Sequence, residues 1–159
     1  MNRLRPIRRN RDGRYELRLG RVERQLLQSL PGQLEPILAS GSDELRRLYP
    51  PAYRDDPGRQ AEYEQLMQAD LTERHRQSLS VLADTAGSRY LTEDELATWL
   101  RAINSLRLVM GTRLGVTEDV ASTRMHKSND PERAQMAIYH YLSYLQEQAV
   151  AALSGSVPE

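Results

Sequence analysis

The chain has 159 residues, of which 39% are hydrophobic, 28% are charged and none is cysteine. A single domain of this length can bury about 70% of its unfolded surface, so it needs no disulfide or structural metal. The absence of cysteine excludes disulfide scaffolds, thiolate metal sites and thiol redox chemistry. The formal net charge is zero, but residues 1–24 hold nine arginines against three acidic residues, which leaves +6 there and −6 elsewhere. No segment approaches ~20 apolar residues and no apolar signal-peptide core is present, so we expect a cytoplasmic protein.

A β-hairpin is predicted over residues 4–19, because apolar and charged residues alternate after the turn sequence Asp12-Gly13. A two-residue loop would place Ile7 and Leu17 on opposite faces of the hairpin. A three-residue loop with a left-handed Gly13 pairs Ile7 with Leu17 on one face, and we prefer it for that reason.

Helical periodicity predicts most of the remaining chain. An apolar stripe formed by Val22, Leu26, Leu27 and Leu30 is interrupted at Pro31, so residues 21–39 form two short helices or one kinked helix. The elements predicted after it are a turn at 43–48, a helix at 57–86 that is continuous or broken near Asp70, a central helix at 93–114, a loop at 116–130 and a C-terminal helix at 131–153.

The central helix is the best specified of these elements. Thr92 and Glu95 have the spacing of a capping box at its start. Its apolar stripe consists of Leu96, Trp99, Leu100, Ile103, Leu106, Met110 and Leu114. We expect Trp99, Ile103 and Met110 to contact both the 57–86 and the 131–153 helices. The fold class predicted for the single domain 1–159 is all-α, a compact bundle of about five helices with the N-terminal hairpin packed on it.

Arg107 lies inside this apolar stripe and is predicted to be mostly buried. The preferred interpretation is a structural ion pair with a carboxylate, for which Asp70, Glu118 and Asp119 are the candidates. The alternative is an anion-binding arginine at the floor of a pocket, which would make the protein a small-molecule-binding helical domain.

The arginines of the hairpin are the other candidate site. Arg5, Arg8, Arg9, Arg11 and Arg14 would suit the phosphates of a nucleic acid or an acidic patch on a partner protein. They would also keep an exposed hairpin soluble and block sheet extension. The zero net charge of the chain gives no general attraction to DNA, which favours the protein partner.

No pattern of residues indicates catalysis. His75, His126 and His140 are widely spaced and fit no metal motif, and the chain lacks a glycine-rich phosphate loop and a G-x-S-x-G sequence. We therefore expect no catalytic residues, no metal and no cofactor, and a protein that is not an enzyme.

Four segments carry a family resemblance: GRYELRL at 13–19, SLPGQL at 29–34, LRRLYPPAYRDDP at 45–57 and LRLVMGTRLGVTED at 106–119. Together they resemble an actinobacterial family, domain of unknown function 2017, from about Tyr15 to Leu153. Some members of this family are known as oxidative-stress transcriptional regulators. The resemblance implies a transcription-linked role through protein or DNA contacts. Sensing through cysteine cannot be carried over, because this chain has none.

The sequence thus predicts a non-enzymatic regulatory protein that binds a protein partner, a component of the transcription machinery. A DNA-binding regulator that uses the arginine-rich hairpin is the alternative, and a small-molecule site around Arg107 is the second alternative.

Overall fold

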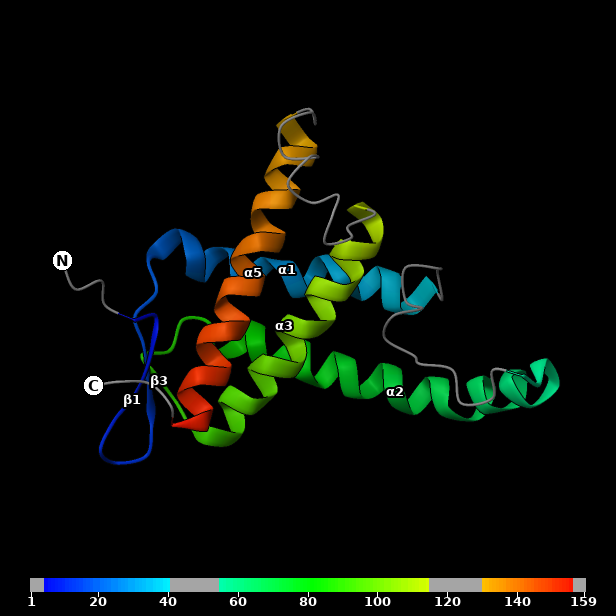
Figure 1. Ribbon diagram of the computed structural model, residues 1–159, viewed down its shortest axis with the longest axis horizontal. Helices are drawn as coiled ribbons and strands as arrows, with labels where there is room; N and C mark the ends of the chain where they lie inside the picture. Colours follow the sequence, from blue (N-terminus) through cyan, green and yellow to red (C-terminus); the bar gives the residue numbers. More distant parts are fainter. Residues whose placement is uncertain (1–4, 41–54, 115–129, 156–159) are drawn as a thin grey trace.

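The computed structural model describes residues 5–40, 55–114 and 130–155. These residues form four long helices with a small antiparallel sheet at one end (Figure 1). The strands are β1 (Ile7–Arg9), β2 (Tyr15–Leu17) and β3 (Tyr90–Leu91), and the helices are α1 (Arg21–Ser40), α2 (Pro57–Thr85), α3 (Glu93–Leu114) and α5 (Asp130–Ser154). The predicted helical bundle with an N-terminal hairpin packed on it is confirmed. The predicted turn at 43–48 and all but the last residue of the loop at 116–130 lie outside the described residues.

The hairpin has the register that the three-residue loop requires. Ile7 pairs with Leu17 and Arg9 with Tyr15, and Gly13 has a φ of +87°, which is the left-handed region that glycine adopts without strain. The sequence did not predict β3, whose Leu91 pairs with Tyr15 on the other side of β2. The hairpin is therefore the outer part of a three-stranded sheet in the order β1-β2-β3.

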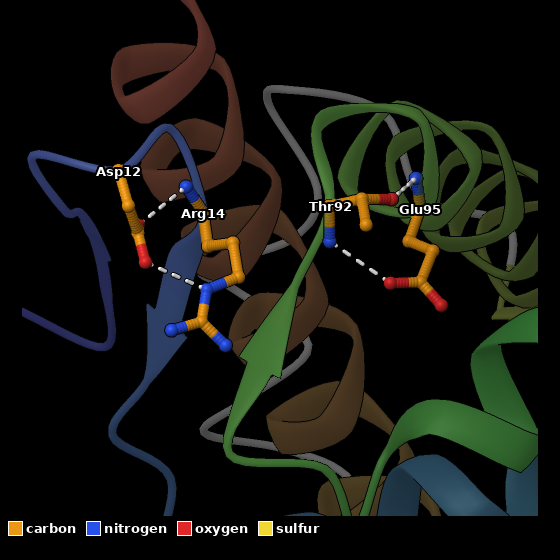
Figure 2. Close-up of polar contacts among 4 residues, drawn as sticks. All are labelled: Asp12, Arg14, Thr92 and Glu95. Carbon is orange, nitrogen blue, oxygen red and sulfur yellow. Dashed lines mark hydrogen bonds and ion pairs between the residues drawn. The ribbon is translucent and has the colours of Figure 1, made fainter.

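Helix α3 begins at the predicted capping box. The backbone N–H of Thr92 donates to Glu95 Oε1 at 2.9 Å, and the N–H of Glu95 donates to Thr92 Oγ1 at 3.1 Å (Figure 2). These two bonds satisfy backbone donors that no turn of the helix could reach. Because β3 ends at Leu91, the cap also fixes the point at which the sheet joins the helix.

The apolar stripe of α3 is the centre of the core. Trp99 is fully buried, and its indole N–H donates to Thr85 Oγ1 of α2 at 2.6 Å. Helices α2 and α5 both pack on α3 (Figure 1). The hydrogen bond of Trp99 shows its expected contact with α2, and the contacts of Ile103 and Met110 with both helices stay a prediction. Helix α1 packs on α3 as well, which the sequence analysis did not predict: Leu30 and Leu34 of α1 lie around the same cavity as Met110.

Helix α1 runs through Pro31 and Pro36 as one helix, and α2 is likewise helical through Asp70. A proline removes one backbone hydrogen bond, but burial of Leu27 on the same helix stabilises the helical path across it. The prediction that Val22 belongs to the buried stripe is wrong, because Val22 is 77% exposed. It lies five residues before Leu27, which is about 140° around the helix.

Arg24 lies on the first turn of α1, and its side chain contacts the sheet. Its guanidinium donates to four backbone carbonyls: Leu17 (2.9 Å), Leu19 (3.1 Å), Ala86 (3.0 Å) and Ser88 (2.7 Å). These carbonyls belong to β2, the turn before α1, and the segment that joins α2 to β3. One half-buried side chain thus fastens the sheet to the start of α1 and the end of α2.

We expect Arg24→Ala to lower the free energy of unfolding by about 3 kcal/mol, because several part-buried carbonyls lose a charged donor at once. Urea unfolding followed by the fluorescence of Trp99 measures this change. Arg21→Ala is the matched control, since Arg21 is exposed on the same turn, and it should change stability by less than about 0.5 kcal/mol. Equal stability of the two variants would show that the four hydrogen bonds of Arg24 do not contribute to the free energy of unfolding.

Replacing Trp99 by Ala should destabilise the protein by about 3 to 5 kcal/mol, since it leaves a cavity at the centre of the core. Trp99→Phe keeps most of the volume but leaves Thr85 Oγ1 without its donor, so a smaller loss of about 1 to 2 kcal/mol is expected. Circular dichroism during urea unfolding ranks the two variants. A Trp99→Ala protein as stable as Trp99→Phe would contradict the central position of this side chain.

Candidate functional site

The outer face of the sheet gathers charged side chains from all three strands. Cross-strand neighbours share a face, and the buried Ile7, Leu17 and Leu91 mark the inner one. Arg8 pairs with Glu16, which pairs with Tyr90, so this row faces outward. We call this outer surface the arginine face and define it by Arg8, Arg14, Arg18 and Arg89 together with Glu16 and Tyr90.

Tyr90 is the aromatic centre of the arginine face. The guanidinium carbon of Arg14 lies 4.4 Å from the centroid of its ring, and that of Arg89 lies 5.3 Å away. Cation–π contacts of this length stabilise the charged groups in place. Both arginine side chains are also exposed to solvent, so they can still donate to a carboxylate or phosphate.

Acidic side chains contact three arginines of this face. Arg14 Nε donates to Asp12 Oδ2 at 2.8 Å, and the backbone N–H of Arg14 donates to Asp12 Oδ1 at 3.0 Å (Figure 2). The backbone and side-chain hydrogen bonds from Arg14 lower the pKa of Asp12 from its usual value, so this carboxylate stays ionised. Glu16 accepts from Arg18 Nε at 2.9 Å and lies 3.7 Å from a terminal nitrogen of Arg89.

The arginine face keeps a positive excess despite these pairs. Side chains of Arg14 and Arg89 remain 52% and 74% exposed. Arg8 of this face, and Arg9 and Arg11 next to it, are exposed, and their side chains make no hydrogen bond or ion pair with another described residue. These three arginines, on β1 and in the turn that follows it, therefore have their donors open to a partner.

Four of the five arginines predicted to bind a partner are thus exposed on the hairpin, whereas Arg5 is half-buried ahead of β1. Arg18, Arg89 and Tyr90 also belong to the arginine face but were not predicted from the sequence. The last two lie on or next to β3, which is too short to show an alternating pattern of its own. Their role in binding, like that of the predicted residues, stays a prediction.

Arg107 does not have the environment that was predicted for it. It is half-buried, and its Nε donates to Ser143 Oγ at 2.8 Å while a terminal nitrogen donates to Gln146 Oε1 at 2.7 Å. Its guanidinium also lies 5.5 Å from the ring centroid of Tyr139. These partners on α5 are all neutral, whereas the carboxylates predicted to pair with Arg107, namely Asp70, Glu118 and Asp119, lie outside the described side chains, so the ion pair stays a prediction. Because the Arg107 side chain is partly exposed, its charge can be stabilised by neutral acceptors and water without a buried counter-charge.

A shallow hollow between α3 and α5 adjoins Arg107, with a volume of about 420 Å³. It is lined by Arg107, Ser143, Gln146, Glu147, Val150, Ala151 and Ser154. The carboxylate of Glu147 lies on the same wall as the guanidinium and would repel an anionic ligand. This arrangement weakens the small-molecule alternative for Arg107.

Within residues 5–40, 55–114 and 130–155, no three histidine or acidic side chains lie close enough together to hold a metal ion. His75 contacts Ser105 instead. His75 Nδ1 lies within hydrogen-bond distance of Ser105 Oγ at 3.0 Å, and the same hydroxyl lies 3.1 Å from the carbonyl oxygen of Arg101. Burial lowers the pKa of His75 from its usual value. No helix among these residues is long and apolar enough to cross a membrane.

Comparison with known proteins places the chain in a family. The model of domain of unknown function 2017 matches residues 4–153, and the chain belongs to that family. It is 31% identical over 133 residues to proteins named oxidative stress regulator AosR from Mycobacterium tuberculosis and Mycobacterium bovis. The match covers 73% of this chain and 60% of each relative, so the chain spans less than two thirds of their length. No solved structure matches it.

Because the partners of Arg107 are neutral and reachable by water, Arg107→Met should lower the free energy of unfolding by only about 1 kcal/mol. Methionine keeps the packing of the aliphatic stem while it removes the guanidinium. Urea unfolding measures the difference. A loss of 3 kcal/mol or more would instead support a buried ion pair at Arg107, because such a loss is typical of a buried charge left without its partner.

Proposed function

We propose that this protein is a non-enzymatic regulator that acts by binding a protein partner, a component of the transcription machinery, through the arginine face. Family membership and the name of the mycobacterial relatives, oxidative stress regulator, support a regulatory role. The observation that carries the binding proposal is the cluster of guanidinium groups on a sheet that Arg24 holds in a fixed position.

The arginine face suits an acidic segment of a protein. Guanidinium groups bind carboxylates through paired hydrogen bonds, and a guanidinium already held beside the ring of Tyr90 loses less side-chain entropy when it binds. Arg8, Arg9 and Arg11 supply charge around Arg14 without a counter-ion of their own. An acidic segment would replace water on these groups and find its donors in place.

Three features favour a protein partner over DNA. The whole chain has no net charge, so attraction to a long polyanion is limited to one end of the molecule. Asp12 and Glu16 interrupt the basic cluster, so it lacks the continuous positive track that successive phosphates of a duplex need, whereas a short acidic segment needs only a few of its guanidinium groups. Two guanidinium groups lie over Tyr90, which leaves its ring poorly placed to stack on a base.

The proposal is tested with Arg8→Ala/Arg9→Ala, which removes one exposed charge of the arginine face and the exposed charge next to it on the edge strand β1, and breaks no side-chain ion pair between described residues. The control is Arg101→Ala/Arg133→Ala, which removes two exposed arginines from α3 and α5. Tagged wild-type protein and both variants are purified from the native host, and bound proteins are quantified by mass spectrometry. We expect at least one transcription component to fall about tenfold or more with the first variant alone.

The same three proteins are titrated with promoter-region DNA at physiological salt, with fluorescence anisotropy as the readout. Nanomolar binding of a specific fragment that is lost only with Arg8→Ala/Arg9→Ala would replace the protein partner by DNA. Equal recovery of every bound protein by all three would remove the arginine face from the function altogether.

A further inference from the structure

The second feature of interest is a small cavity where α1, α3 and α5 meet, at the opposite end of α3 from the sheet. It has a volume of about 80 Å³ and a mostly apolar lining that includes Leu30, Leu34, Leu106, Met110 and Ile138. Gln33 and Gln135, both exposed, are the polar residues at its margin. Its position places a sulfur-containing side chain in a space that small molecules can enter.

The methionines differ sharply in exposure. Met110 is half-buried beside this cavity, whereas Met136 of α5 is fully buried. These are the two methionines whose side chains lie in the described part of the chain, out of five in the sequence. Thioether oxidation depends on access of the oxidant to sulfur, so Met110 is the reactive one of this pair.

We propose that Met110 is a site of reversible oxidation by hydroperoxides. A regulatory role for this oxidation rests on the proposed function. Met110 would supply an oxidant-sensitive group to a chain that has no cysteine. Its chemistry is independent of any partner. The cavity provides the room that the added oxygen atom requires.

The reaction needs only the sulfur atom and the peroxide. A lone pair of the thioether sulfur attacks one peroxide oxygen, and a sulfur–oxygen bond forms as the oxygen–oxygen bond breaks. The departing oxygen takes up the proton of the transferred oxygen and leaves as water from hydrogen peroxide, or as an alcohol from an organic hydroperoxide. Sulfur loses two electrons and the peroxide gains them. Methionine sulfoxide reductases reverse the change with a thiol reductant.

The product changes the packing of three helices. A sulfoxide is polar and accepts hydrogen bonds, but Leu30, Leu34 and Leu106 offer it no donor. The oxidised side chain must therefore turn outward toward solvent or toward the glutamines at the margin. Either movement removes apolar contacts between α1 and the α3–α5 pair.

The test exposes the full-length purified protein to hydrogen peroxide and follows each methionine by peptide mass mapping. We expect the sulfoxide of Met110 to form at least five times faster than that of Met136. Oxidation should lower Tm by about 3 to 8 °C, and treatment with both stereospecific sulfoxide reductases should restore it. Equal rates at the two methionines would overturn the proposal.

Two variants separate Met110 from the other methionines. Met110→Leu keeps the apolar volume and cannot be oxidised, so its Tm should change by less than about 1 °C after peroxide. Met110→Gln imitates the polar product and should show the lowered Tm without oxidant. If Met110→Leu loses as much Tm as the wild type, another methionine carries the effect and the proposal is wrong.

These readouts involve no partner, so their failure leaves partner binding by the arginine face untouched. Conversely, loss of the partner proposal would leave the oxidation rates and melting temperatures of Met110 unchanged. Each proposal can therefore fail alone.

Discussion

The position of the sheet depends on the four hydrogen bonds of Arg24. A three-stranded sheet with strands of two or three residues is too small to be stable alone, and its own ladder leaves the carbonyls of Leu17 and Ser88 facing α1. A guanidinium has five N–H donors in one plane and can meet several such carbonyls together, which a lysine ammonium does not do in the same geometry. Because Arg24 lies on the first turn of α1, the sheet and that helix form one unit. The arginine face therefore has a rigid base.

Local patterns made most of the fold predictable, and contacts between distant segments account for what was missed. The capping box, the three-residue hairpin loop and the helix limits depend on neighbours within a few residues, so the sequence carries them directly. Strand β3 has two residues and exists because it pairs with β2, some 75 residues earlier in the chain. Arg24 and Arg107 show the same limit. Both lie near apolar stripes, but only the tertiary structure gives one of them four carbonyls and the other two neutral side chains.

The candidate site was predictable in its location but not in its organisation. Counting charges identified the hairpin as the basic end of the chain, and the exposure of Arg8, Arg9 and Arg11 agrees with that. Which arginines are already paired could not be deduced, because it depends on side chains brought together by the sheet. Glu16 serves two arginines from different segments, and Tyr90 contacts two others. This pre-organisation distinguishes the arginine face from a merely soluble hairpin.

Helix α1 connects the two surfaces on which function is proposed. Its first turn holds the sheet through Arg24, and two to three turns later Leu30 and Leu34 lie around the cavity beside Met110. Tyr141 of α5 adds a third attachment, because its hydroxyl donates to Glu23 at 2.7 Å on the first turn of α1. A polar group introduced beside Met110 acts on the far end of a helix whose near end is fixed by charged hydrogen bonds. The apolar contacts at the cavity are therefore the weaker attachment, and loosening α1 there would widen the cavity while the arginine face stays in place.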